Sequence, residues 1–279
     1  MSKVLVTGAG GYIGRHVVAK LLEYGHEVIA SDLCFDGIDP RAQRCDIPIF
    51  SGDPNIYEKL DKPETVIHMA WRNGFVHNAP THMADLSSHI VFCQHLIASG
   101  LPKLSIMGSM HEVGYWEGAI DENTPCNPLS QYGIAKNAMR QSVMLMARNS
   151  ACSLRWLRAY YITGDDLRGS SIFGKITAAA AEGKKDFPFT SGKNQYDFID
   201  IDDLAEMIAV ASVQDEYDGI INVCTGVPMS LAERVESFIK EHGFDIRLKY
   251  GAFPDRPYDS PGVWGDATKI QAIMANINR

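Results

Sequence analysis

Two residues one helical turn apart, Tyr132 and Lys136, could carry proton transfer in this chain of 279 residues. Residues four apart on a helix share one face, so the lysine ammonium would lie beside the phenol. A nearby positive charge lowers the pKa of a tyrosine from its usual value of about 10, and Tyr132 could then act as a general acid and base near neutral pH. Ser109, which follows the apolar run 104–108, could donate a hydrogen bond to the same substrate oxygen.

A glycine-dense turn near the start of the chain predicts a phosphate-binding site. The sequence T-G-A-G-G-Y-I-G, residues 7–14, follows the apolar run 4–6 and precedes a helix-like run at 16–24. Glycines let backbone N–H groups approach a phosphate, and a helix N-terminus favours negative charge, so we expect a dinucleotide to bind here. The residues predicted to contact it are Gly8, Gly10, Gly11, Tyr12, Ile13 and Gly14.

An acidic residue at the end of the second apolar run indicates which dinucleotide binds. Asp32 directly follows residues 27–31. A carboxylate there accepts hydrogen bonds from both ribose hydroxyls and repels a 2′-phosphate, which favours NAD over NADP. The positive charge of an oxidised nicotinamide would then join that of Lys136 in lowering the pKa of Tyr132.

Apolar runs and helical segments alternate through about residue 163, which predicts a parallel sheet with helices on both faces. The strands expected in this part are 4–6, 27–31, 47–50, 65–70, 104–108 and 153–159. The helices expected in it are 16–24, 55–60, 82–99 and 132–149.

The second half of the sequence is less regular, with helices expected at 172–182, 202–211 and 231–242 and short strands at 220–224 and 246–250. Segments that pack over the carboxyl ends of parallel strands supply substrate contacts. We therefore expect residues 1–163 to form the cofactor-binding core with the Ser, Tyr and Lys. Residues 164–279 would be mostly a substrate-binding lobe, with segments returning to the core in a single compact unit.

Composition excludes several classes of function. The net charge is −8 and the basic residues are dispersed, so neither nucleic acid nor a membrane surface is an expected partner. The 6 cysteines are scattered without a C-x-x-C pair or a His/Cys cluster, and we expect no disulfide and no metal site. No signal peptide and no apolar run near 18 residues is present, so a cytoplasmic protein is expected.

Taken together, these motifs resemble the extended short-chain dehydrogenase/reductase family, in particular its NAD-dependent sugar-nucleotide epimerase/dehydratase branch. The resemblance covers nearly the whole chain. The matching stretches are 7–14 with T-G-x-x-G-x-x-G, Asp32 with the ribose-binding acid, 52–53 with G-D, 66–70 with V-I-H-x-A, Ser109 with the catalytic Ser/Thr, 132–136 with Y-x-x-x-K, 197–203 with D-F-x-x-V-x-D and 256–259 with R-P-x-D.

The resemblance implies an α/β fold, a Rossmann-type doubly wound parallel sheet with a smaller C-terminal substrate-binding lobe. It implies NAD as cofactor and a small-molecule substrate, a nucleotide sugar. Asp53 would contact the adenine, Ala70 would lie at the cofactor, Lys136 would hold the ribose, and Arg256 would pair with the nucleotide diphosphate. His68 is expected to have a packing or hydrogen-bonding role near the cofactor. Relatives often dimerise through the helices expected at 82–99 and 132–149, so a homodimer is an open expectation.

Departures from the family pattern indicate an altered substrate site. Dehydratases usually follow the catalytic Thr with Asp-Glu, whereas His111 and Glu112 here come two and three positions after Ser109, which disfavours dehydration. Tyr196 stands where an Arg often precedes D-F, and Tyr161 falls in a segment that lacks the usual Asn. The chain also ends soon after residue 266, without the terminal helical segment of many relatives. The candidate substrate contacts are His111, Glu112, Tyr161, Tyr196 and Arg256.

The predicted function is hydride transfer through NAD at a sugar carbon, as a sugar-nucleotide epimerase or 4-ketoreductase. The sequence does not decide between these reactions. A sugar-nucleotide dehydratase and a dehydrogenase of a free sugar or sugar acid are alternatives within the family. A different class, an NAD-binding regulatory protein on the same fold, has no need of Ser109, Tyr132 and Lys136, whose presence argues against it.

Overall fold

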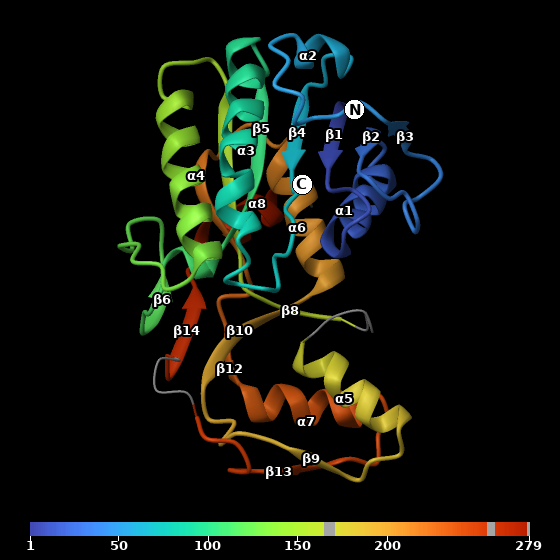
Figure 1. The fold of residues 1–279 in the computed structure, drawn as a ribbon, viewed down its shortest axis with the longest axis vertical. Coiled ribbons are helices and arrows are strands. Elements are labelled where there is room, and N and C mark those ends of the chain that lie inside the picture. The colour runs from blue at the N-terminus through green and yellow to red at the C-terminus, as the bar shows by residue number, and fades with distance from the viewer. Residues whose placement is uncertain (165–170, 256–259, 278–279) are drawn as a thin grey trace.

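The computed structural model describes residues 1–164, 171–255 and 260–277. Among these residues, seven parallel strands form the main sheet in the order β11-β7-β5-β4-β1-β2-β3 (Figure 1). Most residues of these strands are buried because helices cover both faces of the sheet, and most of the strands therefore appear in the sequence as apolar runs. The strands are β1 (Lys3–Thr7), β2 (Glu27–Ser31), β3 (Gln43–Cys45), β4 (Thr65–His68), β5 (Lys103–Ser109), β7 (Ser153–Ala159) and β11 (Gly219–Val223).

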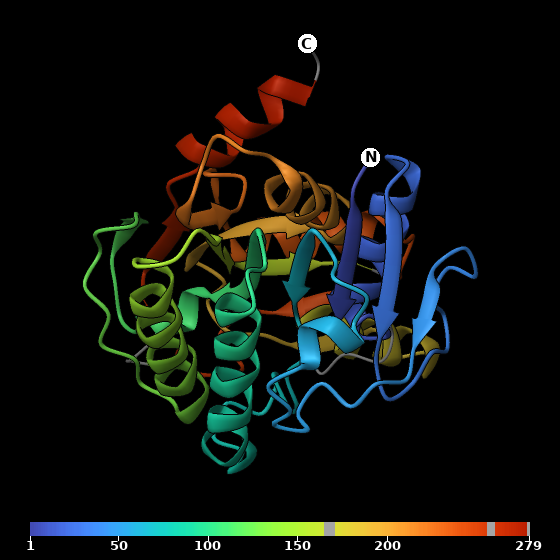
Figure 2. The same cartoon turned by 90° about the horizontal axis from the view of Figure 1, so that it is seen from above.

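Helices pack against both faces of the main sheet (Figure 2). Along β1, Leu5 packs in the cluster that contains the apolar faces of α3 and α4, whereas Val4 and Val6 pack in the cluster of α1 and α6. This alternation is that of a doubly wound Rossmann-type sheet and confirms the predicted fold class. One face carries α2 (Ile56–Lys59), α3 (Thr81–Ala98) and α4 (Gln131–Ala147), and the other carries α1 (Tyr12–Glu23), α6 (Ile201–Val213) and α8 (Thr268–Ile277).

The order of the strands reverses between β1 and β4. The chain first adds β2 and β3 on one side of β1, and then adds β4, β5 and β7 on the other side. In open α/β sheets, ligands bind at such a switch point, outside the carboxyl ends of the strands.

A second, smaller sheet connects the core to the lobe. Its strands pair in the order β12-β10-β14-β6, and β8 also pairs with β10. Asp197 of β10 is fully buried and accepts hydrogen bonds from the backbone N–H groups of Thr225 (2.9 Å), Gly226 (2.8 Å) and Gly265 (3.3 Å). The aspartate of the D-F motif therefore has a structural role, because it connects β10 to these two segments. The strands are β6 (Gly118–Ile120), β8 (Tyr161–Thr163), β10 (Gln195–Asp200), β12 (Pro228–Ser230) and β14 (Gly262–Gly265).

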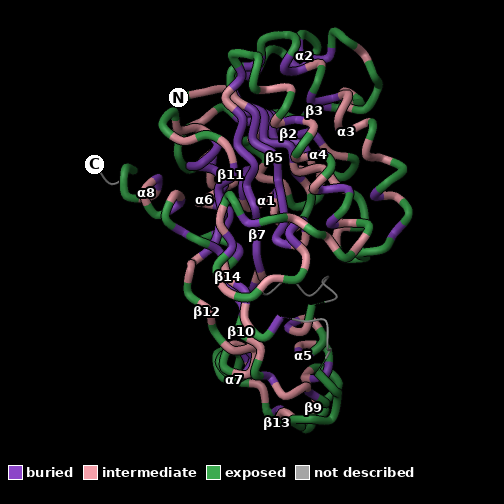
Figure 3. Tube along the Cα trace, turned by 90° about the vertical axis from the view of Figure 1, so that its left-hand side faces the viewer, coloured by how far each residue is buried: buried purple, intermediate pink, exposed green. Residues whose placement is uncertain are grey.

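The lobe lies beyond the second sheet, below the main sheet in Figures 1 and 3. It has its own apolar cluster, in which Phe173, Phe189 and Phe238 are buried. Residues beyond 163 also return to the core, since β11 extends the main sheet and α6 packs against α1. The division of the chain at residue 163 stays a prediction. The lobe elements are α5 (Ile172–Ala181), β9 (Asp186–Pro188), α7 (Leu231–Glu241) and β13 (Arg247–Lys249).

Three local expectations were wrong. Residues 47–50 form no strand, and the edge strand is instead the polar segment β3, which pairs with β2. No strand was expected between residues 108 and 132, yet β6 lies there. No helix was expected after residue 266, but α8 lies there and buries Ile270 and Ile273 in the core. Within the described residues, no helix is both long and apolar enough to span a lipid bilayer.

Candidate active site

The carboxyl ends of neighbouring strands meet at one edge of the main sheet. Thr7 of β1 pairs with Ser31 of β2 on one side and with His68 of β4 on the other. Asp32 directly follows β2, and Ser109 ends β5. The sheet therefore brings the predicted cofactor residues and the predicted proton-transfer residues to the same edge.

The glycine turn has no room for side chains. A Cβ on Gly8, whose φ is +71°, would lie 2.6 Å from Ala70 N, and a Cβ on Gly14 would lie 2.1 Å from Gly8 O. A Cβ on Gly10 would lie 2.2 Å from Cys34 O. These close backbone approaches require glycine and leave the N–H groups at the start of α1 uncovered by side chains of the turn.

The turn and Asp32 together fit the diphosphate and ribose of a dinucleotide. Gly11 is the N-cap of α1 and has no side chain to accept hydrogen bonds from the first helical N–H groups, so an anion can take that place. Tyr12 and Ile13 open the helix and are half-buried. The Asp32 carboxylate accepts a hydrogen bond from Gly10 N (2.8 Å), which holds it beside the turn while it stays partly exposed.

Asp53 has local partners in this structure. Its carboxylate accepts a hydrogen bond from Asn55 N (2.8 Å) and pairs with Lys59, and this ion pair lowers the pKa of Asp53. These contacts order the start of α2. The adenine contact implied for Asp53 stays a prediction.

Tyr132 lies in the first turn of α4, and several contacts fix that turn. The Ser130 hydroxyl caps the helix by accepting from Gly133 N (3.1 Å), and Tyr132 N donates to His77 O (2.8 Å). A Cβ on Gly133 would lie 2.2 Å from His111 O, so only glycine lets α4 approach the loop after β5. Gly133 thus brings Tyr132 close to Ser109, a role that the sequence analysis missed.

The Ser109 side chain lies close enough to the Tyr132 phenol to influence its pKa. Burial of the phenol raises the pKa of Tyr132 to about 12, although Ser109 acts in the opposite direction. The two residues that were predicted to act on one substrate oxygen are therefore adjacent at the carboxyl end of β5.

Lys136 is buried one turn further along α4. Its Nζ donates to Met107 O (2.8 Å) and lies 3.8 Å from the centroid of the Trp71 ring and 5.9 Å from that of Tyr132. Burial lowers the pKa of Lys136 to about 7. Trp71 is a second residue of this site that sequence reasoning missed, because it follows β4 in a segment without a periodic pattern.

The protein's own groups do not lower the pKa of Tyr132, contrary to expectation. Desolvation outweighs the opposing effect of Ser109, the Glu112 carboxylate raises the pKa further, and Lys136 is itself only partly protonated near neutral pH. The sequence analysis also expected the positive charge of an oxidised nicotinamide to lower the pKa of Tyr132, and the chain itself does not carry that charge.

Histidine rings surround Tyr132. His77 stacks on it with ring centroids 5.7 Å apart, and His111 lies 4.3 Å from His77 and 6.2 Å from Tyr132. Burial, followed by the neighbouring His77, lowers the pKa of His111 to about 4, so the ring is neutral. His111 lies where a substrate contact was predicted, and His77 joins it from a loop that the sequence analysis did not assign to the site.

The prediction that Glu112 contacts substrate is wrong. Its side chain is fully buried and pairs with Arg158, whose Nη2 lies 2.8 Å away, and with Trp156 Nε1 (2.8 Å). Its carboxylate also accepts from Ser109 N (3.4 Å). Glu112 is therefore occupied as the anion of a buried ion pair behind the site, which removes one of the two groups that could have served dehydration.

The two predicted tyrosines lie together in the second sheet. Tyr161 of β8 and Tyr196 of β10 have ring centroids 4.3 Å apart, and Tyr196 is buried in the core cluster while Tyr161 is half-buried. Burial of Tyr196 favours a packing role for it. Arg256 lies outside the described residues.

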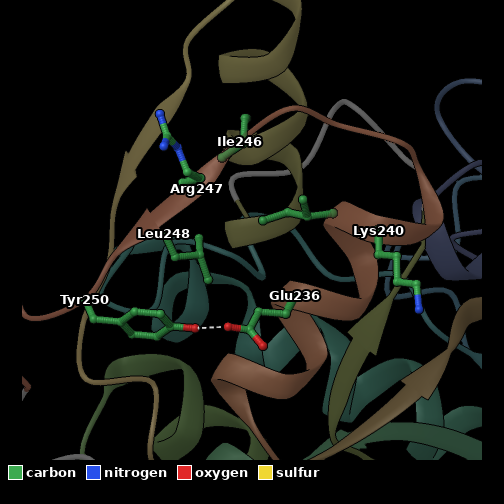
Figure 4. A pocket seen from close by; sticks show the side chains of 7 residues that line it. Glu236, Lys240, Ile246, Arg247, Leu248 and Tyr250 are labelled. Carbon is green, nitrogen blue, oxygen red and sulfur yellow. Dashed lines mark hydrogen bonds between the residues drawn. The ribbon is translucent and has the colours of Figure 1, made fainter.

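A groove of about 370 Å³ lies in the lobe, between α7 and β13 (Figure 4). Apolar side chains, the charged Lys240 and Arg247, and the hydrogen-bonded pair Glu236 and Tyr250 line it, and none of the predicted site residues does. Among the described residues, no group of three or more His, Cys, Asp and Glu side chains could hold a metal ion.

Comparisons with known proteins agree with this geometry. The sequence profile of the NAD dependent epimerase/dehydratase family matches residues 4–224. The chain is 45% identical over 269 residues to the dTDP-6-deoxy-L-talose 4-dehydrogenase (NAD(+)) of Aggregatibacter actinomycetemcomitans, with 94% of this chain and 98% of that protein covered.

Solved structures share the fold. The UDP-glucose 4-epimerase of Thermotoga maritima superposes with a TM-score of 0.81 at 23% identity, over 97% of this chain and 91% of that one. The UDP-glucuronic acid 4-epimerase of Bacillus cereus, solved with UDP-glucuronic acid and NAD, gives a TM-score of 0.80 at 22% identity, over 98% and 93%.

Proposed function

Because the chain belongs to the NAD-dependent epimerase/dehydratase family, as its motifs indicated, we propose that it transfers hydride between NAD and C4 of a nucleotide-linked 6-deoxyhexose. It would act as a 4-dehydrogenase and, in the reverse direction, as a 4-ketoreductase. One observation carries this proposal: Tyr132 and Lys136 lie together beside Ser109 at the carboxyl end of β5, in a chain 45% identical to a dTDP-sugar 4-dehydrogenase.

Residues 8–14 and Asp32 would hold NAD, which supplies the hydride acceptor or donor when bound. Tyr132 would take the proton from the substrate hydroxyl in oxidation and return it to the carbonyl oxygen in reduction. Ser109 would donate a hydrogen bond to the same oxygen, and Lys136, when protonated, would stabilise the phenolate.

His111 and Tyr161 are the proposed substrate contacts that the structure leaves accessible, since neither is fully buried. We also propose a homodimer through α3 and α4, because Met83, Ile134 and Leu145 expose apolar side chains on these helices. A cytoplasmic location is consistent with the free cysteines. Light scattering of the purified chain tests the dimer.

A substrate panel tests the reaction. We expect dTDP-6-deoxyhexoses with NAD⁺ to give NADH, measured by absorbance, and a 4-keto product, measured by mass. A C4 epimer formed without net NADH would assign epimerisation instead. A mass loss of one water from an intact hexose would assign dehydration, and turnover of free sugars alone would assign a dehydrogenase of another substrate class.

A further inference from the structure

A chain of buried hydrogen bonds joins the glycine turn to the middle of α3. Thr7, the last residue of β1, bonds through Oγ1 to His68 Nδ1 (2.7 Å), and His68 Nε2 bonds to His89 Nδ1 (2.8 Å). Thr7 is fully buried, and each of the two histidines has only 2% of its surface exposed.

Counting donors and acceptors fixes where the protons lie. Thr7 Oγ1 accepts from Met69 N (3.2 Å) and Ala70 N (3.3 Å), which engages both of its lone pairs. Its own proton must then go to His68 Nδ1. His68 consequently carries its proton on Nε2 and donates it to His89 Nδ1. Burial lowers the pKa of His68 well below its usual value and that of His89 to about 3, which keeps both rings neutral.

Thr7, at one end of this series of hydrogen bonds, fixes the distance between the glycine turn and the backbone that follows β4. Thr7 directly precedes Gly8, and its hydroxyl ties the end of β1 to Ala70 after β4. At this point the backbones of Gly8 and Ala70 approach so closely that a Cβ on Gly8 would lie 2.6 Å from Ala70 N. The hydroxyl geometry, fixed by His68, therefore holds the turn in the conformation that approaches a diphosphate.

The ring of His89 contacts the catalytic end of the site. It stacks on Trp71 with centroids 4.6 Å apart and planes 25° apart. Lys136 also lies over this indole, with its Nζ 3.8 Å from a Trp71 ring centroid. Trp71 Nε1 also donates to His82 Nδ1 (3.0 Å), so the indole is held from its edge as well. The place of the lysine thus depends on the ring of His89.

We propose that His89 is a positioning residue that aligns both halves of the NAD site: the glycine turn through His68 and Thr7, and Lys136 through Trp71. This inference rests on the proposed function. His89 touches neither cofactor nor substrate in this scheme. It positions the glycine turn through the acceptor atom Nδ1, and it positions Lys136 through the face of its ring that stacks on Trp71.

Two substitutions separate these roles. His89→Asn keeps an acceptor oxygen where Nδ1 lies and removes the ring, whereas His89→Phe keeps a ring and removes the acceptor. We expect His89→Phe to raise the Kd for NAD, measured by calorimetry without substrate, at least tenfold. His89→Asn should raise that Kd by a smaller factor than His89→Phe does, shift the Trp71 indole N–H resonance, and lower kcat at saturating NAD at least tenfold.

The same two substitutions at His242 are the matched control. That ring also forms a hydrogen bond through Nδ1, to Phe238 O (2.9 Å), and packs against the Phe238 ring (4.2 Å), but it lies at the end of α7 in the lobe. Neither His242 variant should change the Kd for NAD or the Trp71 resonance.

Two results would overturn the proposal. One is that the two His89 variants raise the Kd for NAD equally and shift the Trp71 resonance equally, or change neither, which is the result for a packing role. The other is ¹⁵N NMR of histidine in the wild-type protein showing His68 protonated on Nδ1 or charged near pH 7. The binding and NMR measurements need no substrate, so they stand even if the substrate panel refutes the proposed reaction.

Discussion

Replacing Glu112 by Gln should destabilise the fold without removing a reacting group. The carboxylate is fully buried and lies 2.8 Å from Arg158 Nη2 and 3.6 Å from Arg140 Nε, so the amide leaves buried guanidinium charge uncompensated. Breaking a buried pair by neutralising one partner costs about 3–5 kcal/mol. We expect about 3 kcal/mol, because the amide oxygen still accepts from Trp156 Nε1.

For a chain of this size, that loss corresponds to a fall in Tm of about 5 °C. Urea unfolding monitored by circular dichroism gives the free energy, and Glu117→Gln is the matched control, because the Glu117 side chain is exposed and its loss should cost less than about 0.5 kcal/mol. At 25 °C the Kd for NAD and the KM of Glu112→Gln should stay within threefold of wild type. An unchanged Tm together with lost turnover would show that Glu112 acts on substrate, and the reasoning would be refuted.

Two further variants test the electrostatics of the cofactor site. Burial lowers the pKa of Lys136 to about 7, so between about pH 7 and pH 10 the unfolded state binds more protons than the native state, and the native state gains stability as pH rises. Lys136→Met should therefore raise Tm at pH 6–7 by more than at pH 9.5 while weakening NAD binding; a variant less stable than wild type at pH 6 would contradict this. NAD should bind at least tenfold tighter than NADP, and Asp32→Ala should narrow that gap, as calorimetry with both cofactors measures; an equal preference in wild type would contradict the carboxylate argument.

The sequence was sufficient to predict features set by local backbone geometry. The glycine turn and Asp32 lie at strand ends because the apolar runs before them are long enough to form buried parallel strands. The apolar run at 47–50 was wrongly predicted to be a strand, because its side chains pack onto the core from an irregular segment. Ile47 and Ile49 contact the apolar cluster that contains the buried faces of α3 and α4. The short polar strand β3 gave no apolar signal.

Contacts distant in sequence were the part that could not be predicted. Glu112 looked available because it follows Ser109, but its partner Arg158 is 46 residues away. His68 was expected to form a hydrogen bond, yet its partner His89 is 21 residues further on in a helix whose pattern shows only burial. Trp71 and Gly133 contribute to the site through packing that no motif contains.

The most direct test of the central assignment is Tyr132→Phe, assayed with NAD⁺ and the nucleotide sugar that the wild-type protein oxidises. Removing the phenolic oxygen leaves the ring and its stacking on His77, so the Kd for NAD and the Tm should change little. Because the proton then has no acceptor at the substrate oxygen, NADH formation should fall at least about 10²-fold. Undiminished NADH formation by Tyr132→Phe would contradict the assignment of Tyr132 as the acid and base.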